Sequence, residues 1–252
     1  PEALSLIAEF YFSHGYYQQA LSSFALVTEL VSPGADIYQK MGHARQKLGD
    51  YEGAVVDYER AEMLDATSDW TLRRLARCYM ALHRPEEALE RLRILDSRRP
   101  DSAATALNIG RCLVELERYD EAVAAYYKSE YLDNKSAKAL RPLAWCLLMA
   151  GDLHQAGKYY ERVIAETVPT PEDYLNMGHL KLAEGKFSEA MNFYSLNISA
   201  RNGGENATGT AHKAAVDGFI ADMREDAKYL RRIGVDADLV PLLTDAILYG
   251  DK

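Results

Sequence analysis

The chain has 252 residues, 48% of them hydrophobic, and is therefore long enough to bury a sizeable core. Its 29 Lys+Arg against 38 Asp+Glu give a net charge of −9, which argues against general nucleic-acid binding because that function needs a broadly basic face. No apolar run reaches the roughly 18 residues of a membrane-spanning helix, so we expect no membrane insertion.

Three cysteines cannot form a complete disulfide framework, which favours a reducing compartment. The first residues, PEALSLIAEF, lack the basic start and apolar run of a signal peptide. We therefore expect a cytoplasmic location. An export signal upstream of Pro1 stays open, because the chain does not begin with Met.

A period of 34 residues runs along most of the chain. Each block contains a small residue, an alanine twelve positions later, and a bulky residue four positions after that alanine. The three sets are Ala8, Gly42, Ala76, Gly110, Ala144 and Gly178; Ala20, Ala54, Ala88, Ala122, Ala156 and Ala190; and Phe24, Tyr58, Leu92, Tyr126, Tyr160 and Tyr194. The sequence therefore predicts six tandem repeats, at 1–34, 35–68, 69–102, 103–136, 137–170 and 171–204.

Each block is predicted to form two short helices. In the second block, residues 35–50 carry apolar side chains near helical spacing and stop at Gly49, and residues 51–65 carry them at steps of three and four. The small residues fit two helices that cross closely. Pro85 and Pro171 are expected in the first turns of helices, where the missing N–H costs little.

Beyond the sixth block, RNGGENATGT at 201–210 is typical of a linker. Apolar residues from Ala214 to Leu230 then predict a longer amphipathic helix that Gly234 ends, and a last short helix carries Pro241 in its first turns. We expect residues 205–252 to comprise this linker and helices that cap the last repeat. The alternative is a separate interaction helix on a flexible tether.

This pattern resembles the tetratricopeptide repeat (TPR) family over residues 1–204. The resemblance implies an all-α fold, a right-handed α-solenoid of helix–turn–helix repeats with a C-terminal capping segment. Two turns depart from the family pattern: His83-Arg84 and Glu117-Arg118 stand where a glycine and an acidic residue are usual.

Cys78, Cys112 and Cys146 share the tenth position of their blocks. Arg111 beside Cys112 raises the hypothesis of an activated thiol, since positive charge lowers a cysteine pKa. In the family, however, this position is small and packed between helices, so we interpret all three as packing residues. The scattered histidines match no metal-site spacing, and no enzyme motif occurs. We therefore predict no enzymatic activity, no metal and no cofactor.

The resemblance also implies a concave groove lined by the first helix of each repeat. Carrying the groove positions over gives nine candidate peptide-binding residues: Trp70, Arg73, Arg74, Arg77, Asn108, Arg111, Lys138, Arg141 and Trp145. Residues 69–150 contain 14 Lys+Arg and 12 Asp+Glu, a net charge of +2, against −11 for the remainder. A basic groove in an acidic protein favours an acidic partner.

Some TPR domains hold a terminal carboxylate of a peptide with a clamp of Lys, Asn, Asn, Lys and Arg. Asn108 and Lys138 match that pattern, Arg73 keeps the charge, and Arg77 and Pro142 depart from it. The alternative for the arginines is that they are solvated or paired with carboxylates of adjacent helices. Pro142 predicts either a kinked first helix in block five or a delayed start of that helix.

The leading hypothesis is a non-enzymatic scaffold or adaptor that binds an acidic peptide segment of a protein partner in the groove of repeats three to five. The alternative is a structural TPR segment of a larger chain or of a homo-oligomer, assembling through its ends or its C-terminal helices.

Overall fold

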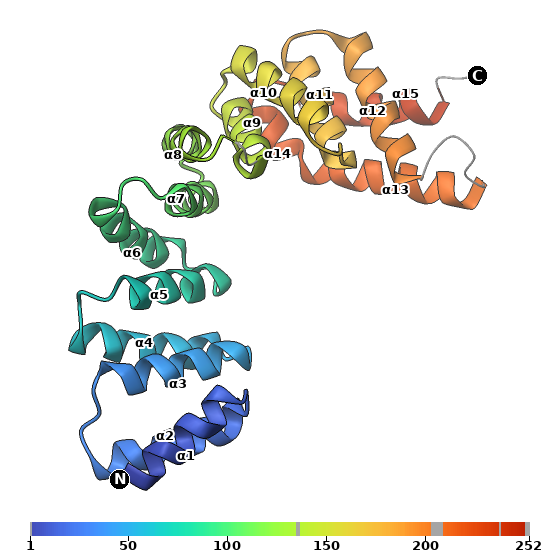
Figure 1. Ribbon diagram of the computed structural model, residues 1–252. Coiled ribbons are helices and arrows are strands. Elements are labelled where there is room, and N and C mark those ends of the chain that lie inside the picture. Colours follow the sequence, from blue (N-terminus) through green and yellow to red (C-terminus); the bar gives the residue numbers. More distant parts are fainter. Residues whose placement is uncertain (1, 135–136, 203–208, 237, 250–252) are drawn as a thin grey trace. The chain divides into compact units, whose positions relative to one another are not determined.

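The computed structural model describes residues 2–134, 137–202, 209–236 and 238–249, and every regular element in these ranges is a helix (Figure 1). The first seven are α1 (Glu2–Ser13), α2 (Tyr17–Leu30), α3 (Ala35–Lys47), α4 (Tyr51–Leu64), α5 (Asp69–Ala81), α6 (Pro85–Arg98) and α7 (Ala103–Glu115). They are followed by α8 (Tyr119–Leu132), the 3-10 helix η1 (Ala137–Ala139), α9 (Leu140–Met149), α10 (Leu153–Glu166), α11 (Pro171–Ala183), α12 (Phe187–Arg201), α13 (Gly209–Glu225), α14 (Ala227–Arg232) and α15 (Leu239–Tyr249). The chain divides into two compact units, Pro1–Glu117 and Arg118–Lys252, and each is described by itself.

Within each unit the two helices of a pair pack on one another: α1 on α2, α3 on α4, α5 on α6, α9 on α10 and α11 on α12. The repeated positions are buried. All six of the recurring alanines have 0% exposure, and the six bulky residues that follow them are buried as well. Gly42 and Gly178 lie so close to the rings of Tyr58 and Tyr194 that a Cβ at either position would overlap the ring. The 34-residue pattern is therefore a packing pattern, which predicts an all-α solenoid correctly.

The turn inside each pair requires a left-handed backbone at one position. Glycine supplies it four times, at Gly15, Gly49, Gly151 and Gly185, with φ between 74° and 83°. His83 and Glu117 hold the same place in the third and fourth pairs, with φ of 53° and 55°. These are the two turns in which the sequence departs from the family pattern, and a residue with a Cβ is strained there.

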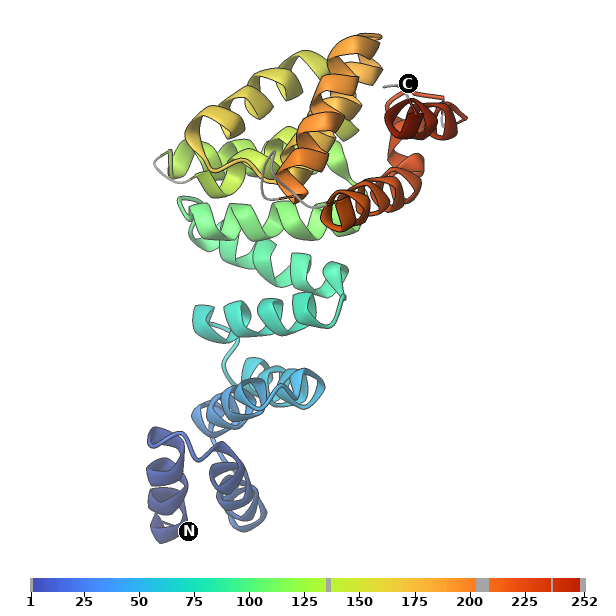
Figure 2. The same cartoon turned by 90° about the vertical axis from the view of Figure 1, so that its right-hand side faces the viewer.

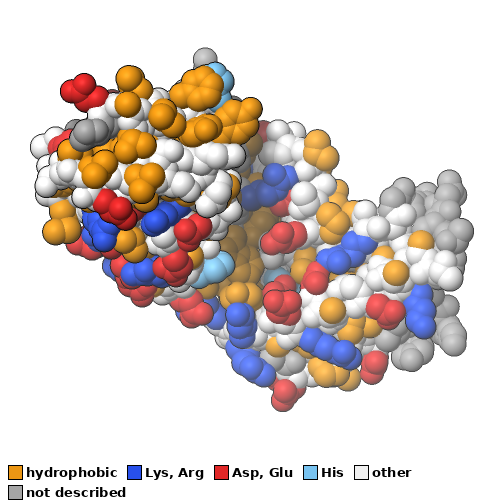
Figure 3. Space-filling model, turned by 90° about the horizontal axis from the view of Figure 1, so that it is seen from below, with side chains coloured by type: hydrophobic (Ala, Val, Ile, Leu, Met, Phe, Trp, Pro, Cys, Tyr) orange, Lys and Arg blue, Asp and Glu red, His pale blue; other side chains and the backbone are white. Residues whose placement is uncertain are grey.

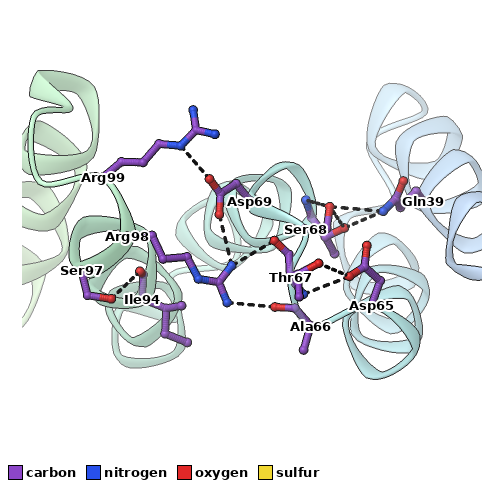
Figure 4. Close-up of polar contacts among 11 residues, drawn as sticks. Gln39, Asp65, Ala66, Thr67, Ser68, Asp69, Ile94, Ser97, Arg98 and Arg99 are labelled. Carbon is purple, nitrogen blue, oxygen red and sulfur yellow. Dashed lines mark hydrogen bonds and ion pairs between the residues drawn. The ribbon is translucent and has the colours of Figure 1, made fainter.

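In the first unit, polar side chains join neighbouring helix pairs across the sequence. Gln39 donates from Nε2 to the Thr71 hydroxyl at 2.9 Å, and Lys40 pairs with Glu9. Figure 4 shows a third contact, in which Arg98 of α6 donates to the carbonyl oxygens of Ala66 and Thr67 at 3.0 and 3.1 Å. This contact fixes the turn between α4 and α5.

In the second unit, Pro142 lies in the first turn of α9, which begins only at Leu140 after the short η1. The delayed start is therefore the outcome, and no interior hydrogen bond of a longer helix is lost to the proline. Thr170 and Asp173 form a capping box at the start of α11, in which each side chain bonds the other residue's backbone N–H.

The C-terminal helices pack on the sixth pair. Phe219 and Met223 of α13 and Leu230 of α14 are buried against α11 and α12. Figure 2 shows α13 and α15 in red beside the orange α12. One expectation is wrong: the helix does not continue to Leu230 but is interrupted at Asp226, which separates α13 from α14. Most of the predicted linker, residues 203–208, lies outside the described residues.

The first helix pair carries apolar side chains that its own unit does not cover. Leu6 is 71% exposed and Phe10 is 54% exposed on α1, and Leu30 is 58% exposed on α2. Figure 3 shows hydrophobic patches on this part of the surface, nearest the viewer at the left.

Candidate peptide-binding site

The first unit contains a cavity of about 420 Å³ between α5 and α7, and we call it the arginine cavity. Its lining residues are Arg73, Ala76, Arg77, Met80, Leu92, Ser102, Ala104, Thr105, Asn108 and Arg111. Four of the nine predicted peptide-binding residues thus lie around one cavity. Arg73 and Arg77 are one helical turn apart on α5, and Asn108 and Arg111 lie on α7.

The charge of the arginine cavity is entirely positive. Its lining contains three arginines and no carboxylate. Arg73, Arg77 and Arg111 are exposed, and none of them forms an ion pair with any described residue. The pairing alternative therefore does not apply to these three.

Other arginines of the same repeats are neutralised. Arg84 pairs with Glu87 at 2.7 Å, and Arg91 pairs with Glu62 at 3.2 Å. Both Arg98 and Arg99 pair with one carboxylate, that of Asp69, at 3.1 and 2.9 Å (Figure 4). The excess of cations predicted for residues 69–150 is thus concentrated in the cavity within this unit.

Trp70 and Arg74 contribute to packing around the preceding pair. The Trp70 ring meets the Tyr58 ring edge-on, with centroids 5.8 Å apart. Arg74 lies over the Trp70 ring at 5.0 Å and donates to Gln46 Oε1 at 3.3 Å. Neither residue lines the arginine cavity.

The remaining three predicted residues lie in the second unit. Lys138 is exposed on η1. Arg141 donates to both oxygens of Asp173 at 2.9 and 3.1 Å, and also to the Thr167 hydroxyl and the Val168 carbonyl. The pairing alternative therefore describes Arg141, whose hydrogen-bonding groups are used within its own unit.

Trp145 has an intramolecular partner that the sequence did not reveal. Tyr229 of α14 packs edge-on against its ring, with centroids 5.0 Å apart and an interplanar angle of 85°. Arg232, one turn further, donates to the Met149 carbonyl at 2.9 Å. Part of the C-terminal segment thus lies along the first helix of repeat five, besides packing on repeat six.

His179 connects the cap to the sixth repeat. The imidazole is buried, with Nδ1 2.9 Å from the Tyr194 hydroxyl and Nε2 3.1 Å from Asp226 Oδ2. Since Asp226 is the residue between α13 and α14, this contact fixes the chain where the two helices meet. No sequence signal pointed to it, because the partners are 47 residues apart.

The three cysteines are buried and free, as packing residues should be. Burial raises the pKa of Cys78 and Cys112 to about 11 and that of Cys146 to about 12. Arg111 is not among the groups that shift the Cys112 pKa, so the activated-thiol hypothesis is wrong. Over the described part of the chain, no three His, Cys, Asp or Glu side chains gather as metal ligands. None of the described helices combines the length and the apolar character that a membrane span needs.

Known proteins with the same repeat were found by sequence and by structure. Tetratricopeptide repeat models match residues 46–108, 103–136 and 143–166. Tetratricopeptide repeat protein 8 of Caenorhabditis elegans is 24% identical over 196 residues, which is 77% of this chain. The matched stretch is 39% of the length of that protein.

Among solved structures, a tetratricopeptide repeat protein from Parabacteroides merdae superposes with a TM-score of 0.65 at 18% identity, covering 98% of each chain. MamA from Desulfovibrio magneticus gives a TM-score of 0.58 at 19% identity, over 65% of this chain and 93% of the other. These likenesses concern the fold. Solenoids of this kind present extended surfaces for binding other proteins. With its repeated packing positions, its helix pairs and the matching repeat models, the chain is a tetratricopeptide repeat protein.

Proposed function

We propose that the protein is a non-enzymatic scaffold that binds an acidic segment of a protein partner at the arginine cavity. The observation that carries the proposal is the set of three exposed arginines around a cavity without a carboxylate. We restrict the proposal to repeats three and four, because Arg141 and Trp145 of repeat five are engaged within their own unit.

The chemistry of the cavity suits a peptide with both acidic and apolar side chains. Guanidinium groups bind carboxylates through two parallel hydrogen bonds. The Asn108 amide offers a donor and an acceptor to a peptide backbone. Ala76, Met80 and Leu92 supply an apolar lining for one side chain of the segment.

The test compares two triple variants that lose the same charge. The cavity variant replaces Arg73, Arg77 and Arg111 by Ala. The control variant replaces three exposed arginines that do not line the cavity, Arg93, Arg99 and Arg118, by Ala. Fluorescence anisotropy measures binding of labelled Glu-rich and Lys-rich peptides that each contain one Leu. An exposed Arg–carboxylate pair contributes up to about 1 kcal/mol, so the cavity variant should bind the acidic peptide roughly 10- to 100-fold more weakly.

Added salt should weaken the wild-type complex with the acidic peptide, because exposed charges are screened. The control variant should retain most of the affinity. Equal binding by the wild type and the cavity variant, or equal binding of the two peptides, would remove the basis of the proposal.

A second candidate function is assembly with another helical surface, and the exposed Leu6, Phe10 and Leu30 favour it. Replacing Leu6 and Phe10 by Lys should abolish any concentration-dependent association seen by light scattering. A wild-type protein that stays monomeric at all concentrations would count against self-assembly.

A further inference from the structure

The second unit contains two cavities that the sequence analysis did not anticipate. The larger, of about 640 Å³, is lined by residues of the repeats and of the C-terminal segment: Trp145, Thr170, Pro171, Glu172, Leu175, Asn176, Arg201, Asp222, Glu225, Asp226 and Tyr229. The smaller, of about 220 Å³, is lined by Arg141, Pro142, Trp145, Tyr160, Glu172, Asp173 and Asn176. Because the two share Trp145, Glu172 and Asn176, we treat them together as the C-terminal cavities.

One buried polar side chain, in the lining of the smaller cavity, has no hydrogen-bonding partner. The Tyr160 side chain is 1% exposed, and its hydroxyl bonds to no described atom. Asn176 is 8% exposed and lines both cavities. Most buried polar groups in folded proteins are satisfied, so the unsatisfied Tyr160 hydroxyl indicates a missing partner.

The C-terminal cavities are acidic, in contrast to the arginine cavity. Their lining contains five carboxylates and two guanidinium groups, a net charge of −3. Arg201 pairs with Asp222, and Arg141 with Asp173. Glu172 and Glu225 are exposed and form no ion pair in the described ranges, so these two carboxylates are available.

The aromatic wall comes from two distant parts of the sequence. Trp145 belongs to repeat five and Tyr229 to α14, and the two rings meet edge-on. Glu172 and Glu225 are divided in the same way, between α11 and α13. The docked C-terminal segment therefore completes the larger cavity, which the six repeats alone do not enclose.

We propose that the C-terminal cavities bind an organic cation, an ammonium or guanidinium group carried on an alkyl stem. Glu172 and Glu225 bind the cationic group, and Trp145 and Tyr229 contact the stem. Lys228 already lies over the Tyr229 ring, 4.6 Å from its centroid, so the attraction of the ligand cation to a ring face is assigned to Trp145. The Tyr160 hydroxyl accepts a hydrogen bond from a ligand that enters the smaller cavity. This site goes beyond the proposed function, because it lies in the other unit and selects the opposite charge.

The cation has two sources, a free amine or a Lys or Arg side chain of a peptide, and two probes separate them. Agmatine represents the free amine, and N-acetylarginine amide represents the peptide side chain. The chain has two tryptophans, so Trp70→Phe leaves Trp145 as the sole indole reporter. Titration of this variant with each probe should give a saturable change in fluorescence.

Matched variants assign the binding to the cavity. Glu172→Gln together with Glu225→Gln should weaken binding by about 10-fold or more, since two available carboxylates are lost. Glu161→Gln with Asp217→Asn removes the same charge from exposed positions outside both cavities and should leave binding unchanged. Tyr160→Phe should weaken binding a few-fold without lowering stability, because the hydroxyl it removes has no partner in the fold.

Saturation by either probe with loss in the double Gln variant supports the proposal, and the probe that binds more tightly identifies the source. No saturable change with either probe overturns it. Undiminished binding by the double Gln variant, or binding of N-acetylglutamine amide as tight as that of N-acetylarginine amide, overturns it as well. Neither outcome bears on the arginine cavity, whose variants are tested separately.

Discussion

Replacing Gly178 by Ala is expected to destabilise the second unit, although alanine is the better helix former. Gly178 lies within α11, and a Cβ there would be 2.5 Å from Cδ1 and 2.8 Å from Cζ of Tyr194, with Cε1 closer still. The Tyr194 ring cannot move away freely. It has 0% exposure, packs on Phe219 with centroids 5.2 Å apart, and its hydroxyl is held by His179.

The magnitude follows from two contributions that lower stability and one that raises it. Forcing an extra methyl group into a packed core typically costs about 1–3 kcal/mol. Replacing a helical glycine by alanine increases the free energy of unfolding by about 0.5–1 kcal/mol. A further cost of about 1 kcal/mol arises if the displaced ring loses its hydrogen bond to buried His179. We expect a net loss of roughly 1–3 kcal/mol in the free energy of unfolding.

Gly157 provides the matched control in the same unit. It lies within α10, and the nearest atom to an added Cβ is Leu180 Cδ2 at 3.6 Å, an ordinary contact. Gly157→Ala should therefore stabilise the unit by about 0.5–1 kcal/mol. Urea denaturation of Trp70→Phe proteins, followed by Trp145 fluorescence, measures both changes. If Gly178→Ala is as stable as Gly157→Ala, the packing argument for the repeated small position is refuted.

Three further predictions concern single residues. Burial raises the pKa of the Asp57 carboxyl from 3.8 to about 6, so the native state binds the extra proton and Asp57 lowers stability as pH rises through this interval. The stability of Asp57→Asn relative to wild type should therefore rise by about 2–3 kcal/mol between pH 4 and pH 7. A stability difference in urea denaturation that stays constant with pH would contradict this. His83→Gly should stabilise the first unit by up to about 1 kcal/mol, because glycine relieves the strain of the left-handed backbone, whereas Gly49→Ala should destabilise it by a similar amount. Urea denaturation followed by Trp70 fluorescence in a Trp145→Phe background measures both changes. Effects of the same sign would be inconsistent with the turn geometry. The three cysteines, Cys78, Cys112 and Cys146, should resist iodoacetamide in the folded protein at pH 8 and react once it is unfolded, because burial disfavours the thiolate. Mass spectrometry measures the alkylation. Alkylation of any one of them at the rate of a free thiol would contradict their packing role.

The sequence predicted the helix pairs well because their packing repeats. Ala20 and its five equivalents are buried, and so is the bulky residue four positions after each of them, so the same packing requirement recurs in all six repeats. Substitutions at the turns were also visible, and His83 and Glu117 now have a structural meaning as strained positions.

The C-terminal segment has no such redundancy. Hydrophobic periodicity identified an apolar face between Ala214 and Leu230, but periodicity does not say which helix that face contacts. The contact of Tyr229 with Trp145 therefore could not be predicted. The interruption at Asp226 coincides with a contact that periodicity does not reveal, because His179 binds that side chain from another helix.

For the candidate site, the sequence indicated which residues face the groove but not which of them have partners. Arg141 and Arg111 look alike in the sequence, and only the structure reveals that Asp173 binds the first. A signal was present nonetheless. Arg141 and Asp173 are 32 residues apart, the same separation as Arg162 and Glu130, so opposite charges at nearly one repeat length mark contacts between neighbouring repeats.

The packing of α13 on α12 also limits how this array can grow. In the repeats, the second helix of one pair contacts the first helix of the next, and α13 occupies that place after the sixth pair. A seventh repeat inserted after residue 204 would have to displace α13, and with it the His179–Asp226 contact and the wall that Tyr229 forms beside Trp145. Adding a repeat would therefore dismantle a binding surface as well as lengthen the solenoid, so the C-terminal segment sets the number of repeats that this unit can hold.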